Sequence, residues 1–362
     1  MFFVVISVFI LLLYCTLVLI FIVGFKRIGY FKNDSAKIDC RATVIVACKN
    51  EENHLPDLFC ALQNQTFTDF DLIFVNDHST DQTENLLLSF KNKVAGVKVL
   101  NATGYGKKNA VKEAIFATTT EFVVTTDADC VPVPTWLETL CRYQTLCPSD
   151  LIICPVSIKE GKGFFHKLQQ LEFATLVGSG AGMVGVGMPI MCNAANMAFR
   201  KSEWIESQFE LHEELLSGDD VFLLTSIKKR KGQIRFLKSL KALVETAASP
   251  DINSFLKQRR RWASKSTKYN DSQLILTAII VFGVNLNLVL LFSLSFFELH
   301  YLYLFFLVYF LKLFFDFVFC KDIYKFLSSP LSVIYVIVLS VIYPFYIVFT
   351  SISSLFWHPK SW

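Results

Sequence analysis

The sequence predicts an α/β domain with a mostly parallel sheet and with transmembrane helices at both ends of the chain. Two observations support this fold class. Apolar, β-branched runs alternate with helical segments between residues 41 and 154, a spacing typical of βαβ units. Of the 362 residues, 53% are hydrophobic and only 18% are charged, and the apolar excess is concentrated at the two ends. This composition is too apolar for a purely soluble protein.

The first apolar run covers residues 2–23 and is followed by Lys26 and Arg27. A run of this length can cross a hydrocarbon core about 30 Å thick. No basic segment precedes it and no small-residue cleavage site follows it, which favours a retained anchor over a cleaved signal peptide. We therefore expect residues 1–25 to form a transmembrane anchor whose carboxyl end, beside the basic pair, lies in the cytoplasm.

The middle of the chain alternates between expected strands and helices. Strands are predicted at residues 43–47, 71–75, 97–100, 122–126 and 151–154. Helices are predicted at residues 55–65, 82–92, 109–117, 136–143 and 221–227. Residues 161–190 are amphipathic and then rich in Gly and Met, which we interpret as a helix followed by a mobile segment near the membrane. Polar groups at 48–53, 76–81 and 127–129 follow strands, where parallel sheets bind their ligands.

Three further apolar runs lie beyond residue 273, at 274–297, 301–319 and 331–355. The first connection between them has no Lys or Arg, whereas the second holds Lys321 and Lys325. This asymmetry favours three more spans that alternate in direction after the anchor. The expected organisation is an anchor at 1–25, a cytoplasmic domain at 40–245, an interfacial segment at 246–273 and three transmembrane helices at 274–362.

Four polar residues interrupt the apolar runs near the carboxyl end: Asn285, Asn287, Lys312 and Asp316. Because polar side chains are costly in lipid, they should face protein or a cavity. Lys312 and Asp316 are four residues apart, so the simplest interpretation is an ion pair within one helix.

Asp127 and Asp129 follow the expected strand at 122–126. Alternate side chains of a strand share a face, so the two carboxylates should point the same way and repel each other. A divalent cation with oxygen ligands would offset that repulsion and could also hold a diphosphate. Taken alone, the pair could equally be an acidic turn.

Composition narrows the partners and the compartment. The net charge of +4 comes without a dense basic stripe interleaved with aromatic residues, which favours contact with anionic lipids over nucleic acid. The ten cysteines are scattered and form no C-x-x-C pair. This argues against a zinc site or a disulfide framework and fits a reducing compartment.

Four motifs follow one another in the chain: Asn76-Asp77-His78-Ser79-Thr80-Asp81, Asp127-Ala128-Asp129, Ser217-Gly218-Asp219-Asp220 and Gln258-Arg259-Arg260-Arg261-Trp262. In order and spacing they resemble the inverting family 2 glycosyltransferases. Those enzymes have the GT-A fold, a Rossmann-like mixed sheet that binds nucleotide-diphospho-sugars. The resemblance covers roughly residues 40–265. It is strongest to membrane-anchored members such as ceramide glucosyltransferases and the hyaluronan, cellulose and poly-N-acetylglucosamine synthases.

The resemblance implies how the donor would be bound. Asp77 would accept a hydrogen bond from the nucleotide base, Glu52 would contact the ribose, and Lys107 would lie near the phosphates. Asp127 and Asp129 would hold Mg²⁺ or Mn²⁺ on the diphosphate. The alternatives from the residues alone are strand-end caps for Asp77 and Glu52 and a surface pair for Lys107 and its neighbour.

The resemblance also implies how the acceptor would react. Asp220 would be the general base, although Asp also favours a helix N-cap. Asp219 stands where many relatives have Glu, and its role stays open. Gln258, Arg261 and Trp262 match Q-x-x-R-W, in which the Arg binds diphosphate and the Trp forms the floor of the acceptor site. The alternative is a basic juxtamembrane helix. The segment from Asn193 to Arg200 resembles the acceptor-side segment of the family.

The implied activity is transfer of a sugar from a nucleotide diphosphate sugar, with UDP favoured, to a lipid or lipid-linked hydroxyl. The partners would be that donor, a lipid or glycan acceptor and membrane lipids. The protein would be integral to the cell membrane with its catalytic domain in the cytoplasm. Two alternatives stay open: a processive polysaccharide synthase, and a non-catalytic membrane scaffold or lipid-binding protein.

Overall fold

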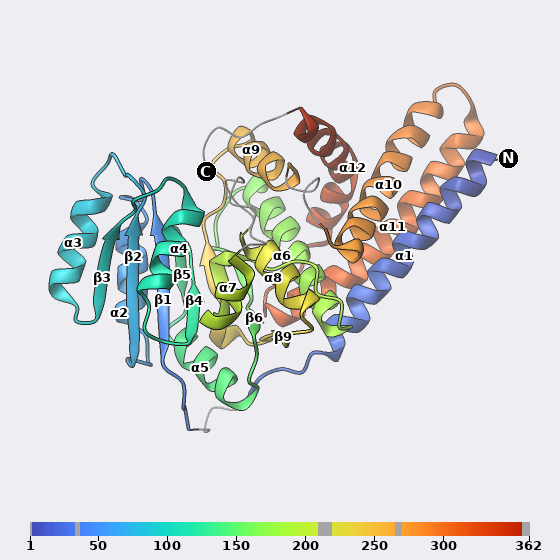
Figure 1. Cartoon of the computed structure of the whole chain (residues 1–362). Coiled ribbons are helices and arrows are strands. Elements are labelled where there is room, and N and C mark those ends of the chain that lie inside the picture. The colour runs from blue at the N-terminus through green and yellow to red at the C-terminus, as the bar shows by residue number, and fades with distance from the viewer. Residues whose placement is uncertain (1, 33–36, 209–218, 265–269, 357–362) are drawn as a thin grey trace. The chain divides into compact units, whose positions relative to one another are not determined.

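The computed structural model describes residues 2–32, 37–208, 219–264 and 270–356 (Figure 1). The chain divides into two compact units. Of the described residues, the helical unit comprises those within 2–27, 160–190 and 248–356, and the sheet unit comprises those within 28–159 and 191–247. Residues 160–190 therefore group with the long helices, and the sheet unit is built from two separate stretches of chain.

The sheet unit is built around a seven-stranded mixed sheet with the order β3-β2-β1-β4-β8-β6-β9. Its strands are β1 (Ala42–Cys48), β2 (Phe70–Asn76), β3 (Val97–Asn101), β4 (Phe122–Thr125), β6 (Leu151–Ile153), β8 (Met197–Arg200) and β9 (Ile234–Phe236). The central strands β3, β2, β1 and β4 are parallel, while β8 is antiparallel to both β4 and β6. All five strands expected from the sequence are present; β8 and β9 were not anticipated.

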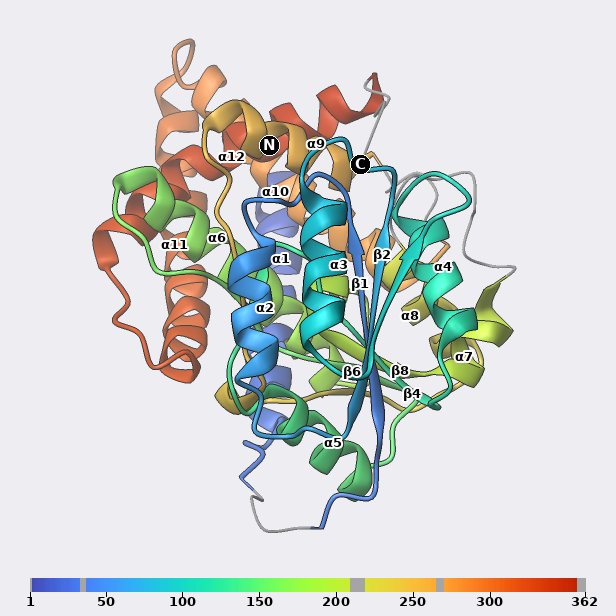
Figure 2. The same cartoon turned by 90° about the vertical axis from the view of Figure 1, so that its left-hand side faces the viewer.

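Helices cover both faces of this sheet. The chain runs through α2 (Leu55–Gln63) and α3 (Thr83–Lys93) while it builds the sheet outward from β1 to β3. It then returns through α4 (Lys107–Ala117) to place β4 on the other side of β1. Because crossovers between parallel strands are right-handed, reversing the direction moves the helix to the opposite face. Figure 2 shows α2 and α3 on one face and α4 on the other.

The core of the sheet unit is apolar on both faces of the central strands. All seven residues of β1 are buried, as expected for a parallel strand covered by helices on both sides. On the face of α2 and α3, Phe59 and Phe90 stack with ring centroids 4.0 Å apart, and both rings also pack edge-on against Phe74 of β2.

A smaller sheet adjoins the carboxyl side of β4. It consists of β5 (Cys130–Pro132), β10 (Val244–Thr246) and β7 (Val156–Ile158), in the order β5-β10-β7. The buried Asn196 connects it to the rest of the unit, because its amide donates to the carbonyls of Pro155 (2.7 Å) and Ala242 (2.8 Å). Its amide oxygen accepts from Trp136 Nε1 at 2.8 Å. The remaining elements of the sheet unit are η1 (Ala194–Asn196), η3 (Leu240–Ala242), α5 (Trp136–Leu146), α7 (Lys201–Ser207) and α8 (Asp219–Lys229).

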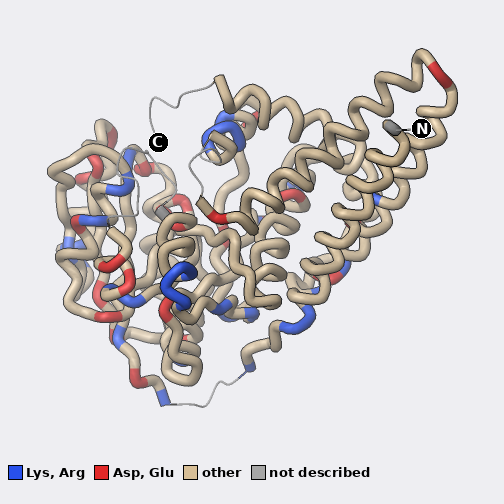
Figure 3. The backbone as a smooth tube through the Cα atoms, turned by 45° about the vertical axis from the view of Figure 1, so that its right-hand side comes forward, with Lys and Arg blue, Asp and Glu red and all other residues tan. Residues whose placement is uncertain are grey.

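The helical unit contains α1 (Phe2–Arg27), α6 (Phe164–Gly185), α9 (Ile252–Ala263), α10 (Ser272–Leu294), α11 (Leu299–Phe326) and α12 (Val333–Leu355). By length and composition, α1, α10, α11 and α12 could each cross a membrane. Figure 3 shows how sparsely charged residues occur along these long helices. The expected Lys312–Asp316 pair is present, with Nζ 2.6 Å from Oδ2.

Contacts along α1 define the directions of its neighbours. Aromatic pairs join α1 to α11 at successive levels, from Phe3–Tyr301 to Phe25–Phe326, so these two helices are parallel. By contrast, α10 is antiparallel to α1, because Ser7 bonds to Asn287 while Ile10 lies at Gly283. The three helices α1, α10 and α11 thus alternate in direction. The carboxyl ends of α1 and α11 lie together, where Lys26 pairs with Asp322 at 3.1 Å.

The glycine-rich part of α6 differs from its sequence-based interpretation. The expectation of a mobile segment is wrong up to Gly185, because α6 is one continuous helix from Phe164 to Gly185. Gly182 and Gly185 lie against α1: a Cβ added to Gly182 would lie 2.5 Å from the carbonyl oxygen of Phe21. The absence of side chains therefore serves close helix packing, which stabilises a sequence of low intrinsic helix propensity.

Candidate active site

Asp127 and Asp129 lie in the turn that joins β4 to β5. The turn is closed by a hydrogen bond from the Cys130 amide to the Asp127 carbonyl at 3.2 Å. Ligand atoms of Asp127, Asp129 and Cys130 lie within 4.8 Å of one another. Both carboxylates are half-buried, and Thr246 of β10 donates to Asp129 Oδ2 at 3.3 Å. The expectation that the two carboxylates come together is confirmed.

Lys107 supplies a positive charge at this turn. It is the first residue of α4, and its ammonium group forms an ion pair with Asp127 Oδ1. The two residues meet because α4 begins, and β4 ends, at the same edge of the sheet. Lys108 points elsewhere, with its Nζ 5.3 Å from the centre of the Phe222 ring. The structure therefore brings Lys107 together with the acidic pair and separates it from its neighbour in sequence.

Glu51 is a third carboxylate near the pair and was not identified from the sequence. Burial raises its pKa, a hydrogen bond from His54 lowers it, and the charges of Asp129 and Asp127 raise it further, with a net increase. The pKa of Asp129 is also raised, first by burial and then by Asp127. Three carboxylates gathered at one edge of the sheet favour a cation. The only signal in the sequence was the doubled Glu at 51 and 52.

The donor set fits a hard divalent cation. Mg²⁺ and Mn²⁺ prefer oxygen ligands, and Asp127 and Asp129 offer carboxylates on one side of the turn. Cys130 is a poor third ligand, because burial and then the charge of Asp129 raise its pKa well above the usual value. It remains a thiol and instead donates to Asp129 Oδ1 at 3.5 Å. These residues could hold an ion whose other ligands come from a diphosphate or water.

Asp77, the expected base-binding residue, is fully buried. Both of its carboxylate oxygens lie 3.1 Å from the Gly106 amide nitrogen, which donates to them. Lys49 Nζ is 3.3 Å from Oδ2 and His78 Nδ1 is 3.1 Å from Oδ1. Asp77 thus fixes the residue that immediately precedes Lys107. A contact between Asp77 and a nucleotide base remains a prediction.

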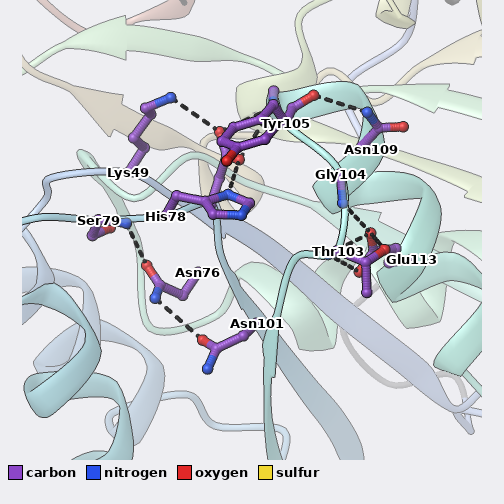
Figure 4. A network of polar contacts seen from close by, with 12 residues as sticks. Lys49, Asn76, His78, Ser79, Asn101, Thr103, Gly104, Tyr105, Asn109 and Glu113 are labelled. Atoms are coloured by element: carbon purple, nitrogen blue, oxygen red, sulfur yellow. Dashed lines mark hydrogen bonds and ion pairs between the residues drawn. The ribbon is translucent and has the colours of Figure 1, made fainter.

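The loop before α4 is rigidly held and presents an aromatic ring. Glu113 accepts hydrogen bonds from the amides of Thr103 (2.9 Å) and Gly104 (3.2 Å) and from the Thr103 hydroxyl (2.7 Å). The Tyr105 ring stacks on the His78 ring, with centroids 4.1 Å apart, and Tyr105 is 74% exposed. Figure 4 shows this stack beside Lys49 and the Glu113 contacts. Neither Glu113 nor Tyr105 was identified from the sequence.

Glu52 serves the structure of the neighbouring helix. Its Oε2 accepts from the amide of Gln82, the N-cap of α3, at 3.0 Å. Its own amide donates to Asp81 at 3.2 Å. Asn50 has a left-handed backbone conformation (φ 57°). After it, the side chain of Glu51 contacts His54, whereas that of Glu52 contacts Gln82. The side chain of Glu52 therefore contacts the start of a helix, which differs from the strand-end cap considered as the alternative, and its contact with a ribose stays a prediction.

Asp220 is held at the start of α8. Its Oδ2 accepts from the Ala194 amide at 3.3 Å and its Oδ1 from the Val221 amide at 2.8 Å. The Ala194 carbonyl in turn accepts from Thr125, the last residue of β4, at 2.8 Å. Asp220 is thus connected to the strand that leads to Asp127. Ser217, Gly218 and the side chain of Asp219 lie outside the described residues.

The Gln258–Trp262 motif lies on α9, in the helical unit. Gln258 accepts from Arg259 at 2.6 Å, and the Arg259 guanidinium lies 4.2 Å from the centre of the Trp262 ring. Arg259, which the sequence analysis did not assign, is the buried arginine of the motif. Because the acidic pair lies in the sheet unit, a single site that unites it with Gln258, Arg261 and Trp262 remains a prediction.

Comparisons with known proteins agree on one family. The model of the family "Glycosyl transferase family 2" matches residues 43–209. The poly-β-1,6-N-acetyl-D-glucosamine synthase of Staphylococcus epidermidis is 24% identical over 158 residues, which cover 42% of this chain and 37% of the relative. An uncharacterized glycosyltransferase of Haemophilus influenzae is 26% identical over 102 residues, which cover 28% of this chain and 32% of the relative. The chain spans about a third of the length of these relatives.

One solved structure resembles the chain over its whole length. It is the mannosyltransferase PcManGT of Pyrobaculum calidifontis in complex with GDP-Man and Mn²⁺, which aligns with a TM-score of 0.57 at 15% identity. The alignment covers 98% of this chain and 99% of that chain. The likeness confirms the expected fold class, a mixed α/β sheet of the GT-A type with apolar helices at both ends.

Proposed function

Since residues 43–209 form a glycosyl transferase family 2 domain, we propose that the chain transfers a sugar from a nucleotide diphosphate sugar to a hydroxyl acceptor at a membrane surface. The observation that carries the proposal is the grouping of Asp127, Asp129 and Lys107 beyond the end of β4. It combines two carboxylates for a cation with an ammonium group for phosphate.

The donor would bind with its diphosphate at this turn. Asp127 and Asp129 would hold Mg²⁺ or Mn²⁺, which would stabilise the negative charge that develops on the departing nucleotide. Lys107 pairs with Asp127 in this structure. With the donor bound, its ammonium group would instead contact a phosphate oxygen, whose negative charge would balance the positive charge of the lysine. Asp77 and Glu52, in the neighbouring loops, are proposed for the base and the ribose. Hydrogen bonds to Glu113 and Asp77 hold the loop from Thr103 to Gly106. They thereby fix the start of α4 and keep Lys107 beside the proposed diphosphate site.

The acceptor would be activated by Asp220. Its carboxylate would remove the proton of the acceptor hydroxyl as the oxygen attacks the anomeric carbon from the side opposite the nucleotide. The bond from that carbon to the diphosphate oxygen breaks in the same step, so the configuration inverts. Asp220 would then carry the proton. On α9, Arg261 is proposed to bind the diphosphate and Trp262 to stack on the acceptor sugar or headgroup, with Gln258 beside it.

A lipid or lipid-linked acceptor at the cytoplasmic face fits the helical unit. Four helices are long and apolar enough to cross a membrane. Basic residues Lys26, Arg27 and Lys325 lie in the last turns of α1 and α11, whose carboxyl ends lie together. Cytoplasmic loops carry an excess of such residues. We therefore propose that the four helices cross the cell membrane and that this end of α1 and α11 faces the cytoplasm.

The second candidate is a processive polysaccharide synthase. It is favoured by the similarity to poly-β-1,6-N-acetyl-D-glucosamine synthase, although the aligned residues cover 37% of that relative. UDP is the donor nucleotide expected from the sequence. The fold neighbour with GDP-Man and Mn²⁺ is a reason to test guanine nucleotides as well.

One experiment separates these functions. The full chain in lipid nanodiscs would be incubated with Mn²⁺ and radiolabelled UDP-glucose, UDP-N-acetylglucosamine or GDP-mannose. Label in a discrete lipid-extractable product supports the proposal, whereas a long polymer supports the second candidate. If the wild type transfers from no donor and matches Asp220→Asn, the protein is a membrane scaffold or lipid-binding protein, and the proposal is wrong.

A further inference from the structure

Arg259 of α9 donates hydrogen bonds both to α6 and to its own helix. Its Nε donates to Glu172 Oε1 of α6 at 3.0 Å, and its Nη2 pairs with Glu172 Oε2. Its Nη1 donates to Gln258 Oε1 at 2.6 Å. The guanidinium also lies 4.2 Å from the Trp262 ring centre and 4.5 Å from that of Phe255. One side chain therefore touches both Gln258 and Trp262.

The pair is almost completely removed from solvent, and its polar contacts extend to a third helix. The side chains of Arg259 and Glu172 are 7% and 8% exposed. Tyr346 of α12 donates to Glu172 Oε1 at 3.3 Å, and its ring lies 5.7 Å from that of Tyr343. Figure 1 shows α9 beside α12. The motif helix is thereby joined to α6 and to a membrane-spanning candidate by directed bonds.

The same polar contacts continue to the ion pair inside the long helices. Lys312 Nζ lies 5.5 Å from the Tyr343 ring centre and bonds to Asp316. Asp316 accepts from Tyr14 of α1 at 2.6 Å. A row of polar and aromatic side chains, only some of them buried, thus runs from α9 through α12 to α11 and α1. It includes Lys312 and Asp316, whose purpose the sequence left open.

A buried ion pair generally adds little to the stability of a fold. The free energy lost when two charges are removed from water is nearly as large as the free energy gained from their attraction, and proteins with apolar residues in place of such a pair are often as stable. The planar guanidinium, however, fixes direction, because its N–H donors lie in one plane and two of them, Nε and Nη2, point at the two oxygens of Glu172. The pair between Arg259 and Glu172 therefore determines where the rest of the arginine points, and with it Gln258 and Trp262.

We propose that Arg259 is a positioning residue, which Glu172 and Tyr346 orient so that it holds Gln258 and Trp262 in their working arrangement. The inference rests on the proposed function, in which Trp262 stacks on the acceptor and Gln258 lies beside it. It assigns to this row of polar and aromatic side chains the coupling of α9 to the long apolar helices.

Two variants separate positioning from stability. Arg259→Lys keeps the charge and loses the fork. The triple variant Arg259→Met, Glu172→Met, Tyr346→Phe removes the polar cluster and leaves none of these groups unpaired, so it should unfold no more easily than the wild type. For both variants we expect kcat to fall, by about 10²-fold in the triple variant, because small displacements of positioned groups are that costly. The donor KM should change little. Lys257→Gln, an exposed charge on the same helix, is the matched control.

A second readout does not depend on activity. In protein labelled with 5-fluorotryptophan, the ¹⁹F signal of Trp262, assigned by its loss in Trp262→Phe, should be one sharp line in the wild type and in Lys257→Gln. In Arg259→Lys and the triple variant it should broaden or split. A sharp single line with wild-type kcat in the triple variant would overturn the inference. A wild type that transfers no sugar refutes the proposed function instead, and the ¹⁹F line still decides whether Arg259 positions Trp262.

Discussion

Gly24 of α1 and Gly182 of α6 meet backbone to backbone. A Cβ at Gly24 would overlap the carbonyl oxygen of Gly182, and a Cβ at Gly182 would lie 2.5 Å from that of Phe21. Gly185 continues the contact one turn further along α6, against the backbone of Gly24. Small residues that let helix backbones approach are a principal means of packing helices in membranes. This crossing ties α6 to α1.

We expect Gly182→Val to destabilise the helical unit, by about 1–3 kcal/mol or more, because the added atoms meet backbone that cannot move aside. The unfolding midpoint in detergent would measure the loss. Gly29→Ala is the matched control, since a Cβ there has nothing within 4 Å. An unchanged midpoint for Gly182→Val would mean that α1 and α6 do not pack as described.

Asp129→Asn should separate the effect of the acidic pair on folding stability from its role in binding a metal ion. Burial and the charge of Asp127 raise the pKa of Asp129, so at neutral pH its ionised form destabilises the metal-free fold. We expect the variant to unfold at a higher temperature than the wild type without metal. Mn²⁺ should raise the midpoint of the wild type, because a ligand that binds only the folded state stabilises it, and should leave that of the variant unchanged.

Asp57→Asn is a suitable control for that experiment, because Asp57 pairs with Lys159 on the surface of α2. It should keep the Mn²⁺ response of the wild type. Equal Mn²⁺ shifts in Asp129→Asn and the wild type would exclude Asp129 as a ligand.

The framework of this site could be predicted because its signals are local. Each central strand is a short β-branched run, and the parallel topology alone places residues 48–53, 76–81 and 127–129 at one edge. The glycine-rich half of α6 could not be predicted, since its sequence disfavours a helix by itself and is stabilised by α1, more than 150 residues away in sequence.

Individual side chains were harder to predict than their neighbourhoods. Which glutamate of the pair at 51 and 52 faces the acidic turn depends on the backbone at Asn50, which sequence periodicity does not reveal. Asn196 was expected on the acceptor side, yet its amide joins carbonyls of Pro155 and Ala242. These partners come together only when the smaller sheet has formed.

The stability contributed by Glu113 should depend on pH. Burial raises its pKa, but hydrogen bonds from Thr103 and Gly104 outweigh this and leave it lowered. A lowered folded-state pKa means that the stabilisation is fully present above the unfolded value of about 4.3 and is lost as pH falls through the folded value. Glu113→Gln should therefore unfold more easily than the wild type at neutral pH.

The gap between the wild type and Glu113→Gln should narrow steadily below about pH 4. Thermal midpoints of the two proteins, measured in parallel across this range, test the prediction. Glu160→Gln, at an exposed position, should follow the wild type throughout. A gap that stays constant with pH would mean that the Glu113 carboxylate is not the source of the stabilisation.

Asp220→Asn should remove catalysis and leave donor binding intact. The carboxylate lies at the start of α8, where the backbone amides of Ala194 and Val221 donate to it. The neutral side-chain amide introduced by Asp220→Asn cannot take up the proton of the acceptor hydroxyl. Loss of a general base typically costs about 10²–10⁴-fold in rate. We therefore expect kcat to fall by that order while the donor-induced rise in the unfolding midpoint persists. Lys229→Gln, in the exposed last turn of the same helix, should keep the wild-type kcat. A variant that lost donor binding together with kcat would show that Asp220 serves the donor, and the base would have to be sought elsewhere.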